Sequence, residues 1–429
     1  MKSLSILAAI FALVSSALAA EMEPIATDME PLAKEYLLLE LSLGQHDPAQ
    51  VDAYFGPDTL KAQAEEEQLP LKDIDLRAQA LAEKLESMEE SDIDPLRLKN
   101  LQLRLMALRT RAAMNLGNKL PFDQESRLLF DAVAPAYGAE HFADILAQID
   151  ALLPGDAPLP ERVTAFRERF VIPPDRVGYI FTAALEECRR RTLEHIDLPK
   201  HESFEIEYVT DKPWSAYNWY EGNSHSIIQV NTDLPIYIDQ AVDLGCHEGY
   251  PGHHTYNALI EQNLVRGKGW WEFSLYPLFS PQSLIAEGSG NYGVDLAFPG
   301  KERIEYERNH LFPLAGLDPT DADRYYRLLE LRGQLDYAIN EAARKYLDGE
   351  FTSEQAQEWL INYALDTPEK AEKRISFFDT YRSYVINYNY GKDLVAAWVE
   401  QDATTSNERW EQFTRLLSSP LSPSDLSPP

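Results

Sequence analysis

The segment GCHEGYPGHHTYN, residues 245–257, places three histidines and a glutamate within eight positions of a chain that has nine histidines among 429 residues. His247 and Glu248 match the start of a His-Glu-x-x-His motif, which on a helix presents two metal-binding side chains on one face. Pro251 takes the place of the second histidine, however, and an adjacent pair of histidines follows two residues later. The segment therefore predicts a metal site whose second histidine must be found from geometry.

A straight helix does not select between His253 and His254 as that second histidine. At about 100° per residue, His253 lies roughly 240° around the axis from His247, whereas His254 is nearly in line but about 10 Å along it. Pro251 lacks an amide hydrogen and crowds the preceding turn, and Gly252 permits unusual backbone dihedrals. We therefore expect a bulge or break at this point. Rotation alone favours His254, whereas a bulge that absorbs two residues favours His253.

Two histidines and a carboxylate are ligands that suit zinc, and a catalytic zinc site keeps one position for water. In the usual motif, the glutamate after the first histidine is the general base, which is the role we expect for Glu248. The segment IAEGSGNYGVD, residues 285–295, reads as a second helix and offers Glu287 as third ligand. The small residues 288–290 would let this helix approach the first one closely. Asp295 is the alternative third ligand.

The motifs HEGYPGHH, AEGSGNYG and YRSYVINYNYG resemble those of a widespread bacterial family that is catalogued as a domain of unknown function and placed among zinc peptidases of the gluzincin type. The resemblance covers residues from about 28 to 400, with its diagnostic motifs between 247 and 391. Relatives can carry another aromatic residue after Pro-Gly-His, so the resemblance implies that His253 is the ligand. It implies one zinc ion per chain and cleavage of a peptide bond by water that Glu248 deprotonates.

The segment DTYRSYVINYNYG, residues 379–391, is rich in hydrogen-bond donors. A developing oxyanion needs such a donor, and we expect Tyr384 or Tyr388 to supply it. Arg382 could hold a substrate carboxylate, which would make the enzyme a carboxypeptidase. Tyrosines three and four residues apart, Tyr381 included, are more often part of a helix core.

The expected fold class is mainly α with a small antiparallel β-sheet, in a gluzincin-like architecture whose active-site helix follows the sheet. Helical periodicity runs from about 28 to 200 and resumes at 236. FEIEYV between them alternates as a half-buried strand does, and SAYNWY and SIIQVN are strand-like. The resemblance implies an edge strand that pairs with an extended peptide, for which HSIIQVN is the candidate, and a sheet that only packs on helices is the equal alternative. The expected regions are a signal peptide (1–19), an N-terminal helical region (20–200), a catalytic metal-binding region (201–415) and a disordered Pro/Ser tail (416–429).

The N-terminus predicts export, to the periplasm or outside the cell. Lys2 precedes an apolar run, and Ala17-Leu18-Ala19 is a small-x-small cleavage site. No later segment predicts insertion into a membrane. The net charge of -31, without a basic stripe, argues against a nucleic-acid partner. Two cysteines, Cys188 and Cys246, are too few for a disulfide framework, so buried free thiols are favoured over a disulfide.

Several other residues are open to two interpretations. Trp270 and Trp271 could line the substrate site or anchor a loop, and His225 could contact substrate or lie on the surface, whereas His310 is expected to be structural. Two other functions would use the predicted metal site: a zinc hydrolase of non-peptide amides or esters, and a catalytically silent zinc-binding or interaction protein. Glu248 argues against the silent alternative, because a metal site alone needs no base. The sequence does not predict the oligomeric state.

Overall fold

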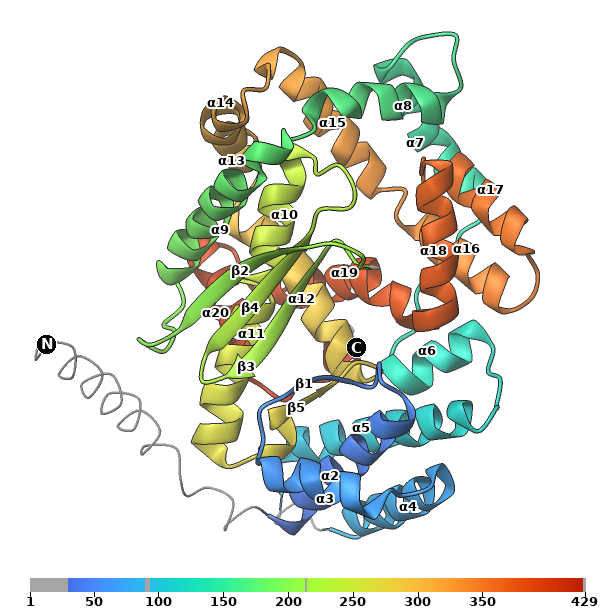
Figure 1. Ribbon diagram of the computed structural model, residues 1–429, viewed down its shortest axis with the longest axis vertical. Coiled ribbons are helices and arrows are strands. Elements are labelled where there is room, and N and C mark those ends of the chain that lie inside the picture. Colours follow the sequence, from blue (N-terminus) through green and yellow to red (C-terminus); the bar gives the residue numbers. More distant parts are fainter. Residues whose placement is uncertain (1–29, 89–92, 213, 427–429) are drawn as a thin grey trace, which may run out of the picture.

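The computed structural model describes residues 30–88, 93–212 and 214–426, and the predicted signal peptide lies outside this part of the chain. The protein is mainly helical, with a three-stranded sheet and a separate two-stranded pairing. The three-stranded sheet directly precedes the helix that carries His247, and the two lie side by side in Figure 1. These features confirm the predicted class, which is mainly α with a small sheet, and the position of the His247 helix directly after that sheet. No helix among the described residues combines the length and the apolar character that a bilayer span requires.

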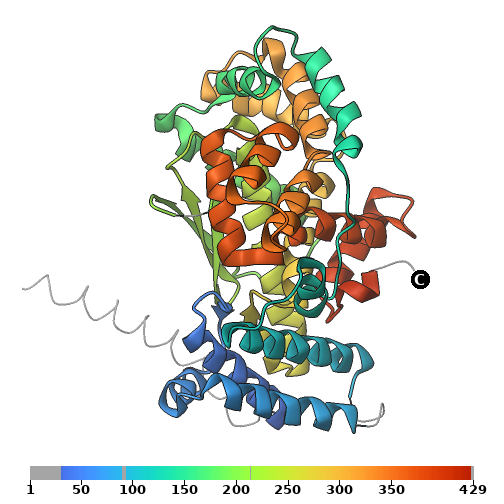
Figure 2. The ribbon, with the colours of Figure 1, turned by 90° about the vertical axis from the view of Figure 1, so that its right-hand side faces the viewer.

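A layer of helices occupies one end of the molecule, at the bottom of Figures 1 and 2. It has its own apolar core, in which Tyr36 and Leu105 are fully buried. A short strand, β1, leaves this layer and pairs antiparallel with β5, a strand close to the central helices. The elements of this layer are α2 (Pro31–His46), β1 (Val51–Tyr54), α3 (Asp58–Glu67), α4 (Leu71–Glu86) and α5 (Pro95–Asn115).

A second, larger core joins the rest of the chain from Ala107 to Leu426. It runs across residue 200, so the change from helix to strand there is a change of secondary structure within one core. The helices before the sheet are α6 (Phe122–Phe130), α7 (Ala139–Leu152), α8 (Leu159–Arg167) and α9 (Val177–Leu193). The elements that follow the sheet are α10 (Ile238–Glu248), α11 (His253–Ile260), β5 (Leu275–Pro277) and α12 (Pro281–Ala297), and α10, α11 and α12 carry two of the sequence motifs. The later helices are α13 (Glu302–Tyr306), α14 (Phe312–Ala315), α15 (Ala322–Gly333), α16 (Tyr337–Leu347), α17 (Ser353–Tyr363), α18 (Pro368–Tyr381), α19 (Ile386–Glu400), α20 (Ser406–Leu417) and α21 (Pro423–Leu426).

The three predicted strands form one sheet, but its pairing differs from the prediction. The strands are β2 (Ser203–Val209), β3 (Ala216–Gly222) and β4 (His225–Asn231), in the order β2-β4-β3. β3 and β4 pair antiparallel as expected, whereas β2 and β4 are parallel. The strand HSIIQVN is therefore central and not the edge. Alternation along a strand reports which residues are buried, but it carries no information on the direction of a neighbour.

The two cysteines form a disulfide, contrary to the expectation of free thiols. Cys188 on α9 and Cys246 on α10 are both fully buried, with their Cα atoms 5.4 Å apart. The pairing arises because α9 and α10 pack side by side with the two cysteines facing each other. The disulfide thus fixes α10 to α9 one residue before His247.

The C-terminal segment is also ordered where a disordered tail was expected. Residues 416–426 include the end of α20 and all of α21, which packs on α12 and α19. Ser422 and Leu426 are buried, and Lys99 of α5 forms an ion pair with Asp425. The Pro/Ser composition concealed this because a few apolar anchors suffice to fix a short segment on an existing surface.

Candidate metal centre

The chain breaks between α10 and α11, at the point where the sequence places Pro251 and Gly252. The α10 helix ends at Glu248 and α11 begins at His253, with the Gly252 amide donating to the Cys246 carbonyl across the break. A Cβ atom on Gly252 would lie 1.8 Å from the His247 carbonyl oxygen, so only glycine fits this close approach. The break turns the chain back, and the His247 and His253 rings lie 4.6 Å apart, centroid to centroid.

The third component comes from α12, which runs through the middle of the molecule beside α10 (Figure 1). Glu287 lies on the face of α12 that meets His247. The small residues of this helix have separate purposes: a Cβ on Gly290 would meet the His247 ring at 2.8 Å, whereas one on Gly288 would meet the backbone of Gly391 in α19. The predicted close approach of the two helices is therefore present at Gly290, and a second close approach, to α19, was not predicted.

Together His247, His253 and Glu287 form a compact group of potential metal ligands, called the metal cluster below. One ligand atom from each lies within 4.8 Å of the others. The His247 Nε2 atom lies 3.2 Å from Glu287 Oε2, and His253 Nε2 lies 3.9 Å from Glu287 Oε1. Ligand atoms about 2.1 Å from a tetrahedral zinc ion stand a little over 3 Å apart, so these separations are of the right size.

Two buried polar atoms of the metal cluster have no hydrogen-bond partner in the described chain: Glu287 Oε2 and His253 Nδ1. The contact of Glu287 Oε2 with His247 is close, but its angles are not those of a hydrogen bond. Buried polar atoms are normally satisfied, and an ion bound by Glu287 would satisfy one of these two. Two imidazoles and one carboxylate are also a donor set that zinc favours, with one position left for water. The residues present therefore fit a zinc ion.

Asn291 and Tyr384 orient two members of the metal cluster. Asn291 follows Glu287 by one helical turn; its amide donates to the Tyr388 carbonyl, which leaves its Oδ1 atom facing His247 Nδ1 at 3.1 Å. His247 Nδ1 then carries a proton, which leaves Nε2, on the side of Glu287, as the ring nitrogen that could bind an ion once it is deprotonated. The hydroxyl of Tyr384 donates to Glu287 Oε1 at 2.7 Å. Hydrogen bonds of this kind to ligating side chains fix their orientation.

The structure directs His254 away from the metal cluster. Its ring is fully buried, with Nδ1 at 2.8 Å from the Ser226 hydroxyl and Nε2 at 3.2 Å from Glu202 Oε2. Glu202 also contacts Tyr250 and Arg189, so His254 belongs to a network that ties the break to β4 and α9. Of the two histidines left open by the sequence, the structure thus places His253 beside His247.

Glu248 is 6 % exposed and lies beside the metal cluster at the end of α10. Its backbone carbonyl accepts a hydrogen bond of 2.7 Å from Asn218 of β3, which fixes the end of the helix against the sheet. Burial raises the pKa of the Glu248 carboxyl to about 7, with nearby Glu287 and Asp52 adding to the shift. A carboxyl with a pKa near neutrality is suited to taking up and releasing a proton.

The two histidines of the metal cluster differ in their proton affinity. Burial alone would lower the pKa of His247, but its contacts with Glu287 and the charge of Glu248 raise it to about 9. Burial and the neighbouring His247 lower the pKa of His253 to about 4. Burial works against ionisation of Glu287, yet both histidines hold its pKa below the usual range. An ionised carboxylate and a neutral imidazole are the forms that bind metal.

The tyrosine-rich segment reaches the site, but its members have different contacts. The hydroxyl of Tyr384 donates a hydrogen bond to Glu287. The hydroxyl of Tyr388 makes no hydrogen bond within the described chain, and Tyr388 is 37 % exposed. Arg382 is directed elsewhere: its Nε atom donates to the buried Glu125 at 2.7 Å. Tyr388 is therefore the better placed of the two predicted oxyanion donors, and Arg382 is held in an ion pair.

The remaining candidates lie outside the metal cluster. Asp295 forms an ion pair with Lys392 at the surface, and His225 contacts the Ser203 hydroxyl. Trp270 packs on Phe273, with Lys268 and Arg97 over its ring, as in the anchoring alternative. His310 is exposed, and its ring stacks on that of Tyr306.

Three residues beside the site were not foreseen: Asp52, Tyr217 and Tyr276. Asp52 lies at an irregularity in the β1–β5 pairing and accepts a hydrogen bond from the Tyr217 hydroxyl of β3. Burial raises the pKa of Asp52 to about 7, and the charge of Glu287 adds to the shift. Asp52 occurs in a segment with no recognisable motif, far in sequence from Glu248. By contrast, the i, i+4 spacing from Glu287 could have pointed to Asn291.

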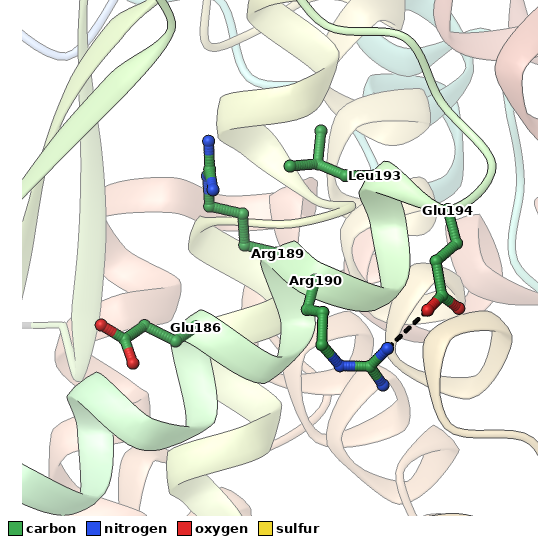
Figure 3. Close-up of a pocket in the computed structure, with 5 residues that line it drawn as sticks. All are labelled: Glu186, Arg189, Arg190, Leu193 and Glu194. Carbon is green, nitrogen blue, oxygen red and sulfur yellow. Dashed lines mark hydrogen bonds and ion pairs between the residues drawn. The ribbon is translucent and has the colours of Figure 1, made fainter.

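A separate surface pocket of about 440 Å³ lies on the outer face of α9 and is lined by Glu186, Arg189, Arg190, Leu193 and Glu194 (Figure 3). Arg190 forms ion pairs with Glu187 of the same helix and with Glu194, the residue that directly follows it. None of the metal cluster lines this pocket, and its charged residues are arranged as an ion-paired helix surface. We therefore assign it no part in the site.

No family model matches the chain, and no curated protein matches it. Among solved structures, the chain is similar to a protein described as the putative lipoprotein from Colwellia psychrerythraea, with a TM-score of 0.51 and 15% identity over 83% of this chain and 71% of that one. It is more distantly similar to an M32 carboxypeptidase from Deinococcus radiodurans R1, with a TM-score of 0.40 and 13% identity over 90% and 88% of the two chains. At this identity the first likeness shows a shared fold.

Proposed function

We propose that the protein is a zinc-dependent peptidase. The observation that carries this proposal is the convergence of His247, His253 and Glu287 across a broken helix, with Glu248 immediately beside them. A metal site that is only structural is usually closed by four protein ligands, whereas a catalytic one has three and a base nearby. The resemblance of the three sequence motifs to gluzincin-type peptidases points in the same direction.

In this proposal His247, His253 and Glu287 hold the ion, and the chain's other residues handle protons and orientation. A bound zinc ion supplies a Lewis acid that polarises a peptide carbonyl and acidifies water. Glu248 accepts the proton of the attacking water and returns it to the nitrogen of the leaving amine. Tyr388 donates a hydrogen bond to the carbonyl oxygen as negative charge develops on it. Tyr384 and Asn291 hold Glu287 and His247 in position throughout.

Replacing Glu248 by glutamine tests the proposal, because glutamine keeps the shape of the side chain but does not accept the proton. The wild type should hold about one zinc per chain and cleave peptides from a mixed digest, with the products identified by mass spectrometry. The Glu248→Gln variant should keep the zinc and lose cleavage by at least about 100-fold. Glu305→Gln, at an exposed position on α13, is the matched control and should behave as the wild type.

Three results would decide against parts of this proposal. Cleavage retained by Glu248→Gln would remove Glu248 as the base. A wild type that holds zinc but cleaves amide or ester model compounds in preference to any peptide would make it a zinc hydrolase of another substrate class. Zinc binding without any hydrolysis would indicate a catalytically silent protein. The proposal includes export, as the N-terminal segment predicts, so that the enzyme would meet its peptide substrates outside the cytoplasm.

A further inference from the structure

An acidic group lies beside the metal cluster that the proposed mechanism does not use. Asp52 of β1, Tyr217 of β3 and Tyr276 of β5, called the Asp52 group below, come from three strands that meet next to α12. The β1–β5 register shifts between Val51 and Ala53, so Asp52 lies at a bulge, while Ala53 is opposite Tyr276. A bulge of this kind turns one side chain away from the regular pattern of a strand.

The Asp52 group has unused hydrogen-bonding capacity. One oxygen of Asp52 accepts from Tyr217, and the other makes no hydrogen bond within the described chain. The Tyr276 hydroxyl is buried in a residue that is only 6 % exposed, and it too has no hydrogen-bond partner there. The single proton of the nearby Ser283 hydroxyl is directed to the carbonyls of Leu278 and Pro277, so Ser283 does not donate to Tyr276. Unsatisfied buried hydroxyls are rare in folded proteins and point to a missing partner.

Charge identifies the kind of partner. Burial raises the pKa of Tyr276, and the charges of Asp52 and Glu287 add to the shift. The Tyr276 hydroxyl is therefore close enough to feel both Asp52 and the metal cluster. Glu287 is the charged neighbour that acts on Asp52, whereas His247, Glu287 and Asp52 act on Glu248. No lysine or arginine of the described chain is among these neighbours. Three acidic side chains thus lie close together at the site, and a cation is the kind of ligand that such a group attracts.

We propose that the Asp52 group is a substrate subsite that binds a protonated amine. An ammonium group has three donors and no acceptor, which matches the free oxygen of Asp52 and the lone pairs of the Tyr217 and Tyr276 hydroxyls. Asp52 and Tyr217 are both partly exposed, so a ligand can reach them. Arg382, the residue expected to hold a substrate carboxylate, is occupied by Glu125 instead. The site therefore selects peptides by a cationic group, which is either the free N-terminus or a lysine side chain.

This inference rests on the proposed peptidase function, and a binding experiment separates the two. Zinc-loaded Glu248→Gln protein, which should bind peptides without cleaving them, is titrated calorimetrically with tetra-alanine and with its N-acetyl derivative. A second pair of N-acetylated peptides differs only by lysine or norleucine at one position. The same titrations are made with Glu248→Gln/Asp52→Asn and, as the matched control, with Glu248→Gln/Asp295→Asn. Asp295 is an exposed acidic residue on the same helix as Glu287.

The free-amine peptide should bind about 10- to 100-fold more tightly than its acetylated form, and Asp52→Asn but not Asp295→Asn should abolish the difference. A difference confined to the lysine and norleucine pair, again abolished by Asp52→Asn, would support the same subsite with a side chain as its ligand. Equal binding of both members of both pairs, or a preference that survives Asp52→Asn, would overturn the subsite and leave the peptidase function intact. Failure of the wild type to bind or cleave any peptide would overturn both.

Tyr276→Phe provides a second variant should Asp52→Asn fold poorly. The substitution removes only a hydroxyl that has no partner, so the free energy of unfolding should stay unchanged or rise. The preference for the free amine should nevertheless fall several-fold. An unchanged preference in a Tyr276→Phe protein of normal stability and zinc content would contradict the role of Tyr276 in the Asp52 group.

Discussion

Tyr384→Phe separates the two tyrosines that the sequence offered as oxyanion donors. The Tyr384 hydroxyl donates to Glu287 Oε1 at 2.7 Å, and the residue is only 3 % exposed. Its ring packs edge-on against Phe130, 5.8 Å away, and phenylalanine would preserve this contact. The substitution therefore removes one hydrogen bond to a metal ligand and little else.

The expected effect is on metal affinity. A hydrogen bond to a charged group contributes about 1.5–3 kcal/mol, which corresponds to a change in an equilibrium constant of roughly 10- to 150-fold. Partners of metal ligands affect metal affinity by about 10- to 100-fold. The zinc dissociation constant of Tyr384→Phe should therefore rise by roughly 10- to 100-fold, whereas kcat under saturating zinc should change only a few-fold.

Competition with a chromogenic chelator measures the zinc affinity, and peptide cleavage under saturating zinc measures kcat. Tyr292→Phe is the matched control, because its hydroxyl also bonds a glutamate, Glu400, outside the metal cluster. Tyr388→Phe should give the reverse result, with normal zinc affinity and a kcat lower by about 10- to 1,000-fold. If Tyr384→Phe binds zinc as tightly as the wild type and loses its turnover, then Tyr384 contacts the substrate and the assignment made from the structure is wrong.

Two further predictions concern stability. Burial alone would raise the pKa of Asp366, but Arg374 and Lys370 hold it at about 2, below its ordinary value of 3.8. This contribution is present above pH 4 and is lost as the pH falls towards 2, so over that interval urea unfolding should show the wild type losing about 2 kcal/mol more than Asp366→Asn. An equal loss in both proteins would contradict the assignment. The disulfide between Cys188 and Cys246, with a sequence separation of 58 residues, should stabilise the fold by about 2–4 kcal/mol. A reductant should therefore lower the urea midpoint of the wild type but not that of the double alanine variant, and equal midpoints for all samples would show that the disulfide adds no stability.

The sequence predicted the residues of the metal cluster because their chemistry leaves a strong local signal. Glu248 follows His247 directly, and Glu287 is surrounded by small residues that a close helix contact requires. The choice between His253 and His254 was not determined by helical rotation. It depends on how far the chain turns back at the break, which is a property of the folded backbone around Gly252.

The Asp52 group could not be predicted, because its residues come together only through tertiary structure. Asp52 lies on a four-residue strand, and its position beside Tyr276 depends on pairing between segments that are far apart in sequence. The direction of β2 and the central position of β4 are likewise set by strand order and not by alternation. Leu426 was missed for a similar reason: a few buried anchors in a Pro/Ser-rich segment have no periodicity to reveal them.

Zinc content tests the central claim most directly, measured on the purified wild type beside His247→Ala, His253→Ala, His254→Ala and Glu287→Ala. We predict about one zinc per chain in the wild type, loss of the metal in three of the variants, and retention in His254→Ala, whose ring is bound to Ser226 and Glu202. Circular dichroism of each variant checks that the fold is intact. Loss of zinc from a folded His254→Ala with retention in His253→Ala, or a wild type that binds no zinc when it is supplied, would contradict the account.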